Sequence, residues 1–194
     1  MKETPKKLFA AYVGESQARN RYTFFSKIAK KEGYALIARI FNETAEQERQ
    51  HGSWFYKMLQ DFKKEEFFDD FKVCEEYPTT YGNTIENLKS AVQGENMEWQ
   101  TLYPNLADTA EKEGYPAIAK RTRAIARAEQ HHAERYGKLL KLVGDDAFFK
   151  RGNKVVWVCL ECGYEVEMDE LPDNWVCPSC SHPRAYFMKK CEDF

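Results

Sequence analysis

The sequence predicts an all-α four-helix bundle followed by a small, mainly β or loop domain that is stapled by a metal ion. Over roughly the first 146 of the 194 residues, apolar side chains recur at alternating spacings of three and four, as in helices that bury one face. Beyond that point the pattern stops, and two C-x-x-C pairs follow within 22 residues. We therefore expect two domains, residues 1–146 and 147–194.

The composition excludes several functional classes. Lys and Arg number 29 against 31 Asp and Glu, so the net charge of −2 offers no basic excess for binding nucleic acid. The longest apolar runs, Leu8–Val13 and Val155–Leu160, each have six residues. A membrane span needs about 20 consecutive apolar residues, and the apolar core of a signal peptide needs at least about 7. We therefore expect a cytoplasmic protein that binds neither nucleic acid nor membranes.

Four stretches carry the helical pattern, and glycine and proline mark their ends. Gly33 and Gly114 stand where the first and third helices should stop, because glycine readily adopts the left-handed conformation that ends a helix. Pro116 suits the first turn of the fourth helix, and Gly144 its end. The apolar stripes cover residues 8–29, 37–58, 88–109 and 118–143.

Two further features concern the start of the bundle and its longest connection. Thr4 followed by Pro5 predicts an N-cap and a first helical residue for the first helix. Residues 60–83 include Pro78 and Gly82 but few periodic apolar positions. They predict a long crossover between the second and third helices.

The two helical pairs are related by duplication. The sequence Lys31-Glu32-Gly33-Tyr34 recurs 81 positions later as Lys112-Glu113-Gly114-Tyr115. The interval of 81 also relates Glu48 to Glu129 and His51 to His132, and an interval of 80 relates Glu15 to Glu95. A duplicated helix hairpin with one long crossover predicts the ferritin-like arrangement of four helices.

Carboxylates and imidazoles occupy the helix faces that should pack together. Each of the four stripes carries one glutamate, and the second and fourth also carry a histidine three residues after it, on the same helix face. A further glutamate, Glu98, lies about one turn beyond Glu95. The complete set is Glu15, Glu48, His51, Glu95, Glu98, Glu129 and His132.

Burial of these carboxylates favours a pair of bound cations. An isolated buried carboxylate costs several kcal/mol, and surface ion pairs would scatter around the helices instead of repeating in one register. Two divalent cations would nearly balance five carboxylates. Oxygen ligands with two imidazoles suit iron or manganese. One Glu from each of two helices with Glu-x-x-His from the other two is the ligand pattern of di-iron bundles.

Other polar residues near this pattern are not expected to bind the metal ions directly. His131 adjoins the motif but points about 100° away from the seam, since successive helical residues are rotated by that angle. Tyr22 and Tyr103 lie one to two turns from glutamates of the set, and each is either a hydrogen-bond donor to a metal-bound carboxylate or core filler. We expect solvated positions for the off-seam residues Glu43, Glu46, Glu111, Glu113 and Glu134.

The C-terminal domain is too small to fold on its core alone. About 40 residues cannot bury enough apolar surface, so a metal staple is expected. Four thiolates suit tetrahedral zinc or a single iron, and the candidates are Cys159, Cys162, Cys177 and Cys180. A structural zinc ribbon is the plainer alternative. A redox-active di-iron core, however, needs electrons, which an iron tetrathiolate can supply. Residues 145–154 should form the linker, and Cys74 and Cys191 should be ordinary thiols.

The sequence resembles the rubrerythrin family along nearly its whole length. The stretches that carry the resemblance are Gly14–Tyr22, Glu43–His51, Gly94–Trp99, Ala128–His132 and the two cysteine pairs. The resemblance implies a ferritin-like domain followed by a rubredoxin-like domain. It implies a non-haem di-iron centre, bridged by oxo and carboxylate groups, held by Glu15, Glu48, His51, Glu95, Glu98, Glu129 and His132. It also implies one iron held by the four paired cysteines, with Tyr22 and Tyr103 as hydrogen-bond donors beside the di-iron ligands.

The family resemblance also implies a function. It points to a cytosolic enzyme that reduces hydrogen peroxide to water in oxidative-stress defence, with electrons relayed through the iron tetrathiolate site. The electrons would come from NAD(P)H through a separate reductase or a small redox carrier. The sequence departs from the family at Ser181, where a cysteine knuckle usually has glycine because the turn needs a positive φ.

Two other functional classes remain open at this point. Iron storage would also use di-iron chemistry, but it needs no electron delivery, so the cysteine domain disfavours it. A zinc-stapled scaffold without redox activity would be colourless, whereas ferric tetrathiolate is red.

The sequence also bears on assembly. The fourth helix should continue about 18 Å beyond His132 before Gly144. Unless the linker folds fully back, a chain's own cysteines are then far from its di-iron site. We therefore expect at least a homodimer, arranged head to tail, with electrons passing between chains.

Overall fold

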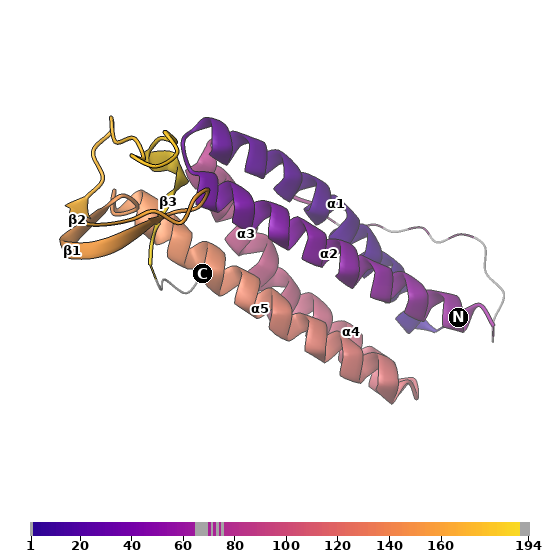
Figure 1. Ribbon diagram of the computed structural model, residues 1–194. Helices are drawn as coiled ribbons and strands as arrows, with labels where there is room; N and C mark the ends of the chain where they lie inside the picture. Colours follow the sequence, from indigo (N-terminus) through magenta and orange to yellow (C-terminus); the bar gives the residue numbers. More distant parts are fainter. Residues whose placement is uncertain (1, 65–69, 71, 73, 75, 191–194) are drawn as a thin grey trace.

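The computed structural model describes residues 2–64, 70, 72, 74 and 76–190. It is an elongated helical bundle with a small three-stranded sheet at one end (Figure 1). The helical elements are α1 (Glu3–Lys31), α2 (Ala35–Phe62), α3 (Thr84–Met97), the π-helix η1 (Glu98–Leu102), α4 (Tyr103–Lys112) and α5 (Pro116–Gly144). No helix among the described residues is long and apolar enough to cross a membrane.

The bundle consists of two helical hairpins, as the duplication predicts. α1 packs along α2, and the α3–η1–α4 rod packs along α5. Gly33 and Gly114 close the first helix of each hairpin with φ angles of 88° and 90°, the left-handed region in which glycine carries no Cβ penalty. The next residues, Tyr34 and Tyr115, donate their backbone N–H to the carbonyls of Ala29 and Ala110, 2.8 Å away in both hairpins.

The predicted third helix is not continuous. We expected one α-helix over residues 88–109, but η1 interrupts it at Glu98–Leu102 with the wider π geometry. A π segment accommodates one additional residue in a helix. The duplication shows where that residue lies, because Glu15 and Glu95 are 80 positions apart whereas Tyr22 and Tyr103 are 81 apart. The third helix has therefore gained a residue between Glu95 and Tyr103, and the π segment accommodates it.

The prediction for the start of α1 was wrong. The N-cap is Lys2, and no side chain of α1 caps the helix. Instead, the Glu113 carboxylate accepts hydrogen bonds from the backbone N–H of Glu3 and Thr4, at 2.8 and 3.0 Å, and from the Thr4 hydroxyl at 2.6 Å. Glu113 was expected to be solvated but is half-buried, because it neutralises the unpaired amides at the helix start.

The other hairpin repeats this arrangement. Glu32 accepts hydrogen bonds from the backbone N–H of Thr84 at 2.9 Å and from its hydroxyl at 2.6 Å. Each helix turn therefore supplies the carboxylate that caps the first helix of the opposite hairpin. α3 also has a capping box of its own between Asn83 and Glu86.

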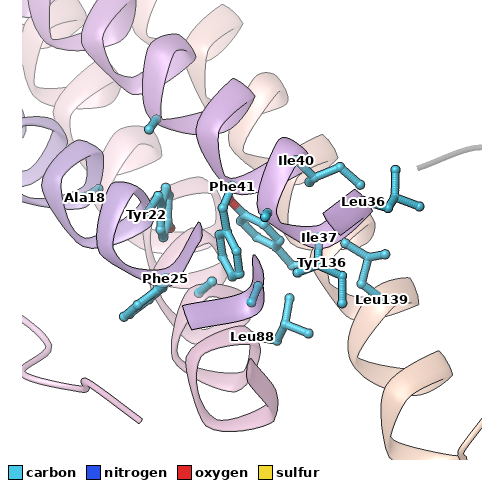
Figure 2. Close-up of a cluster of buried hydrophobic side chains, with 14 of the residues drawn as sticks. Ala18, Tyr22, Phe25, Leu36, Ile37, Ile40, Phe41, Leu88, Tyr136 and Leu139 are labelled. Atoms are coloured by element: carbon cyan, nitrogen blue, oxygen red, sulfur yellow. The ribbon is translucent and has the colours of Figure 1, made fainter. Parts of the chain in front are cut away.

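An aromatic core fills the half of the bundle nearest the sheet. Tyr22 and Phe25 from α1, Phe41 from α2 and Tyr136 from α5 meet there, with ring centroids 5.0–6.1 Å apart (Figure 2). All four side chains are buried. They exclude water from the middle of the bundle on the side that faces the C-terminal domain.

The C-terminal domain is a three-stranded antiparallel sheet with the strand order β2-β1-β3. Its elements are β1 (Lys150–Cys159), β2 (Glu165–Glu170), the short helix η2 (Arg184–Tyr186) and β3 (Phe187–Lys189). We expected a linker over residues 145–154, but β1 already begins at Lys150. Its first residue pairs with Glu170 ahead of a shift in register. Trp157, Leu171 and Phe187 are fully buried beneath the cysteines.

The sheet domain rests on the end of its own bundle. Tyr34, in the α1–α2 turn, packs edge-on against Phe148 and parallel to Phe149, with centroids 5.2 and 6.0 Å away. Arg39 of α2 donates hydrogen bonds to the Leu160 carbonyl at 3.2 Å and to the Glu161 carboxylate. These contacts fix the cysteine domain to the N-terminal end of α2 (Figure 1).

The long connection joins the C-terminal end of α2 to the start of α3. α2 extends to Phe62, slightly further than expected, and the described residues between it and Thr84 form no helix or strand. Cys74, in this connection, is exposed. Cys191 lies outside the described residues.

Candidate metal centres

The seam glutamates and histidines converge in the middle of the bundle. One group consists of Glu15, Glu48, His51 and Glu129, and the other of Glu48, Glu95, Glu129 and His132. Within each group one ligand atom from every residue lies within 4.8 Å of the others. Glu48 and Glu129 belong to both groups, so each could bridge two ions. The remaining members are one glutamate and one histidine per ion, related by the duplication.

His51 faces the first group with its Nδ1 atom. That nitrogen lies 2.8 Å from Glu129 Oε1, 3.0 Å from Glu48 Oε2 and 4.0 Å from Glu15 Oε1. The three carboxylates come from α5, α2 and α1, and each is at most 1% exposed. One imidazole nitrogen thus stands where three buried carboxylates meet.

His132 repeats this geometry in the second group. Its Nδ1 lies 2.8 Å from Glu129 Oε2, 3.2 Å from Glu48 Oε1 and 3.5 Å from Glu95 Oε2. The rings of the two histidines are nearly parallel, with centroids 5.8 Å apart. Glu48 and Glu129 therefore present one oxygen to each histidine.

The donor atoms fit a pair of cations. Both Glu129 oxygens, Glu48 Oε1, Glu95 Oε2, Glu15 Oε2 and His132 Nδ1 are buried without a hydrogen bond of acceptable geometry. Buried polar atoms are normally paired, because an unpaired one costs roughly 1–3 kcal/mol. Here the unpaired atoms all point at two common centres. Hard oxygen atoms with one imidazole per centre form a donor set suited to iron or manganese.

Electrostatics show the strain that cations would relieve. Burial, followed by repulsion from Glu129 and Glu48, raises the pKa of Glu15 well above its ordinary value. Burial and repulsion from Glu48 raise the pKa of Glu95 to about 8. Burial would also raise the pKa of Glu48, but the two histidines outweigh it and lower that pKa to about 2.

Burial acts on the pKa values of the histidines in the opposite direction from those of the glutamates, because it disfavours the charged imidazolium. Burial alone would lower the pKa of His51, but Glu129 and Glu48 raise it to about 10. The pKa of His132 is raised for the same reason, with Glu95 as a third partner. Protons thus partly replace the positive charge that the carboxylates require.

Glu98 stands beside the two groups. It begins the π-helix and is 9% exposed. Burial, followed by repulsion from Glu95, Glu129 and Glu48, raises its pKa well above the ordinary value. Its side chain also lines a cavity of about 490 Å³ together with Gly14 and Tyr77. Among the expected bundle ligands it is the one that borders this cavity.

Two tyrosines hydrogen-bond to the terminal carboxylates. The Tyr22 hydroxyl donates to Glu95 Oε1, and the Tyr103 hydroxyl donates to Glu15 Oε1, both at 2.5 Å. Each tyrosine lies on one hairpin and its glutamate on the other. Both side chains are buried. The bond from Tyr22 leaves Glu95 Oε2 facing His132, and the bond from Tyr103 leaves Glu15 Oε2 without a hydrogen-bond partner. These contacts match the hydrogen-bonding role that was one of the two expectations for the tyrosines.

Sequence reasoning missed the residues that support His132. Its Nε2 lies 3.0 Å from Oε1 of Gln47 on α2. Arg135, one turn further along α5, is 4% exposed and contacts Glu43 and Thr44. The signal available in the sequence was an arginine on the buried face of α5. His131 is exposed and belongs to neither group.

The four paired cysteines also converge. Their sulfurs lie within 4.8 Å of one another, with Cys159 and Cys180 at 3.7 Å and Cys162 and Cys177 at 3.6 Å. The Tyr164 backbone amide lowers the pKa of Cys162 to about 6. The His182 amide lowers that of Cys180, but desolvation and the neighbouring sulfurs raise it to about 12. Four sulfurs at these separations can surround one tetrahedral ion.

The two cysteine pairs sit on similar turns. Gly163 and Ser181 donate their backbone N–H to the carbonyls of Cys159 and Cys177, both at 2.9 Å. Gly163 has φ 74° and Ser181 has φ 60°. The serine therefore adopts the strained left-handed conformation that the sequence comparison indicated. Sequence reasoning did not include His182, whose Nδ1 lies 3.3 Å from Cys180 Sγ.

Comparisons with known proteins agree with this organisation. The rubrerythrin family model matches residues 6–140, and the model of the rubrerythrin rubredoxin-like domain matches residues 157–188. A protein of Methanocaldococcus jannaschii is 51% identical over 100% of this chain and 96% of its own length. Rubrerythrin-1 of Clostridium acetobutylicum is 45% identical over 99% of this chain and 96% of its own.

A solved structure extends the similarity to the fold. Nigerythrin in its fully reduced, all-ferrous state superposes with a TM-score of 0.64 at 30% identity, covering 97% of this chain and 87% of that one. Fold and comparisons together define a ferritin-like bundle protein with an appended rubredoxin-like domain. Within that class, the chain belongs to the rubrerythrin family.

The electrostatics predict how metal-free protein responds to pH. Glu15, Glu95 and Glu98 have raised pKa values, so the folded state binds protons more tightly than the unfolded state. Their stabilising contribution is complete below pH 4.5 and is lost as the pH rises toward 8, the pKa of Glu95. The free energy of unfolding should fall by about 1.4 kcal/mol per pH unit for each retained proton.

The measurement is chemical denaturation of metal-free protein between pH 5 and pH 8. The raised pKa values of His51 and His132 act in the same direction above pH 6.5. Glu95→Gln, which removes one titrating group, should flatten the slope. Stability that stays constant or increases over this range would contradict the description of the site.

Proposed function

We propose that the protein is a non-haem di-iron peroxidase that reduces hydrogen peroxide to water. The observation that carries the proposal is the convergence of unpaired, buried carboxylate oxygens and His132 Nδ1 on two common centres, beside a four-cysteine site. In this proposal the bundle site performs the reaction and the cysteine site delivers electrons. A relative solved in an all-ferrous state supports iron as the metal.

The bundle would hold each iron through a similar set of ligands. Glu15 and His51 would bind one ion, Glu95 and His132 would bind the other, and Glu48 and Glu129 would bridge them. Glu98 would complete the first site when His51 leaves it, because ferric iron prefers carboxylate and ferrous iron accepts imidazole readily. When bound, the two ions supply the two electrons that cleave the peroxide O–O bond.

The surrounding residues contribute order and access. Tyr22 and Tyr103 hold Glu95 and Glu15 in place through short hydrogen bonds from the opposite hairpin. The aromatic cluster around Phe41 keeps water out from one side. The cavity that Glu98 lines lies between α1 and the α3–η1–α4 rod. It is the approach that we propose for the peroxide.

The cysteine domain favours this function over iron storage. Storage requires no electron supply, whereas repeated peroxide reduction requires two electrons per cycle. Cys159, Cys162, Cys177 and Cys180 would bind one iron as a tetrathiolate, although the same sulfurs also suit zinc. The electrons would enter from an NAD(P)H-dependent reductase or a small redox carrier. A protein of this type acts in the cytoplasm in oxidative-stress defence.

Replacing one cysteine should separate electron delivery from peroxide chemistry. We predict that Cys159→Ser removes the red colour of a ferric tetrathiolate and slows turnover with an external reductant by about tenfold or more. Protein whose bundle iron is chemically reduced beforehand should still react once with hydrogen peroxide, which stopped-flow spectroscopy can follow. Cys74→Ser, at an exposed cysteine outside the cluster, is the matched control. Loss of the single turnover in Cys159→Ser would refute the division of labour.

We further propose that the working unit is a head-to-tail homodimer or a larger assembly. Arg39 holds the cysteine domain at a point nine residues from Glu48 along α2, which corresponds to about 14 Å of helix. An antiparallel partner could place its cysteine domain beside the middle of the bundle. Two-fold symmetry would then form two such contacts.

Complementation tests this arrangement. Cys159→Ser and the double variant Glu95→Ala, Glu129→Ala should each be inactive with the external reductant. After subunit exchange, each heterodimer has one intact route between chains, so an equal mixture should recover about a quarter of wild-type activity. Confirmed exchange by native mass spectrometry with no recovery would show that electrons travel within each chain.

A further inference from the structure

The two histidines of the bundle differ in what supports them from outside. His132 Nε2 lies 3.0 Å from Gln47 Oε1. Gln47 Nε2 in turn lies 3.4 Å from Glu43 Oε1. A carboxylate only accepts hydrogen bonds, so the Gln47 amide donates to Glu43 and turns its carbonyl oxygen toward His132. His132 must then carry a proton on Nε2, so that Nδ1, which faces the carboxylates, is the nitrogen that can bind a metal ion when it gives up its own proton.

Arg135 completes this chain of contacts. It donates to Glu43 Oε1 at 3.0 Å through Nη1 and to Thr44 Oγ1 at 2.5 Å through Nη2. The Arg135 guanidinium is buried and planar. It therefore fixes the position of the Glu43 carboxylate, although the Glu43 side chain is mostly exposed. The chain runs from α5 to α2 and returns to α5 one turn from His132. The ring of His132 is therefore fixed by the contact of its Nε2 with Gln47, and Gln47 is linked through Glu43 and Arg135 to the helix that carries His132.

His51 has no such chain. The duplication interval of 81 places Ala128 at the position of Gln47 and Ala124 at that of Glu43, and Arg135 corresponds to Trp54. Among the residues that the structure describes, no hydrogen-bond partner faces His51 Nε2. The side chain is 13% exposed, against 3% for His132. The imidazole of His132 is therefore held by a hydrogen-bond partner behind it, whereas the imidazole of His51 is free to move.

We propose that Gln47 is a positioning residue that fixes His132 as the permanent imidazole ligand, and that the absence of its counterpart at Ala128 makes His51 the ligand that can be released. The inference rests on the proposed function only in assuming that the two groups bind metal ions. It adds the reason why two halves with the same Glu-x-x-His motif behave differently. The asymmetry lies in the residues behind the histidines, not in the ligands themselves.

The first experiment measures metal affinity. Partners behind a metal-bound histidine typically contribute 10–100-fold in affinity. Titration of metal-free protein with Zn²⁺ should show one bundle site weakened by about that factor in Gln47→Ala. Gln47→Glu keeps an acceptor and should restore the affinity. Gln50→Ala, at an exposed glutamine on the same helix, should match the wild type.

The second experiment observes the proton itself by NMR of the Zn²⁺-loaded protein. In the wild type the His132 Nε2–H should be visible and slow to exchange with water, and that of His51 should be broadened by exchange. Gln47→Ala should lose the His132 signal. Ala128→Gln, which restores the missing acceptor, should make the His51 signal appear.

The outcomes separate this inference from the proposed function. Wild-type protein that binds no pair of ions in the bundle would overturn the proposed function. Normal two-ion binding with Gln47→Ala unchanged in both affinity and the His132 signal would overturn the role of Gln47. An absence of any His51 signal in Ala128→Gln, with that variant folded and fully loaded, would overturn the assignment of Ala128.

Discussion

The burial of five carboxylates in one layer of the bundle is the constraint on which the rest of the structure depends. Glu15, Glu48, Glu95 and Glu129 are essentially inaccessible to water, and Glu98 is nearly so. Left uncompensated, such charges would either protonate or prevent the helices from packing. The raised pKa values of Glu15 and Glu95 and the protonated histidines describe the first of these responses. Two bound cations would remove the conflict and leave the carboxylates ionised.

The hairpin duplication explains how so much charge can be placed accurately. Each half supplies one Glu-x-x-His motif, one terminal glutamate, one tyrosine that reaches across to the other half, and one carboxylate that caps the opposite hairpin. A symmetric site forms because the two halves pack face to face. Two departures from symmetry lie at the site, where the π-helix introduces Glu98 and Gln47 supports one histidine. We interpret these departures as the features that distinguish one proposed iron position from the other.

Much of this could be predicted from local sequence patterns. The helix ends at Gly33 and Gly114, the seam positions of the glutamates and histidines, and the four-cysteine cluster all follow from periodicity and short spacing. The features that were missed depend on contacts between distant residues. Glu113 displaced Thr4 as the cap of α1 because the opposite hairpin brings a carboxylate to that end. The early start of β1 depends on pairing with Glu170, and the role of Gln47 depends on the packing of α2 against α5.

The π-helix is an intermediate case. Its cause was present in the sequence, as the difference between the intervals of 80 and 81, but a continuous apolar stripe over residues 88–109 concealed it. The extra residue shifts Tyr103 back into register with Glu15 while leaving Glu95 facing His132. Ligand geometry on both sides of the insertion is therefore preserved, and Glu98 is the residue that gains a new position.

The most direct test of the central claim is to locate the metals in fully loaded protein. Crystals grown from protein purified with iron should be measured with anomalous diffraction on both sides of the iron absorption edge, together with elemental analysis of the same sample. The account predicts three metal ions per chain, two iron ions between the Glu-x-x-His motifs with Glu48 and Glu129 bridging them, and one among the four cysteine sulfurs. A fully loaded crystal with a single bundle ion, bound by one Glu-x-x-His motif, would contradict it.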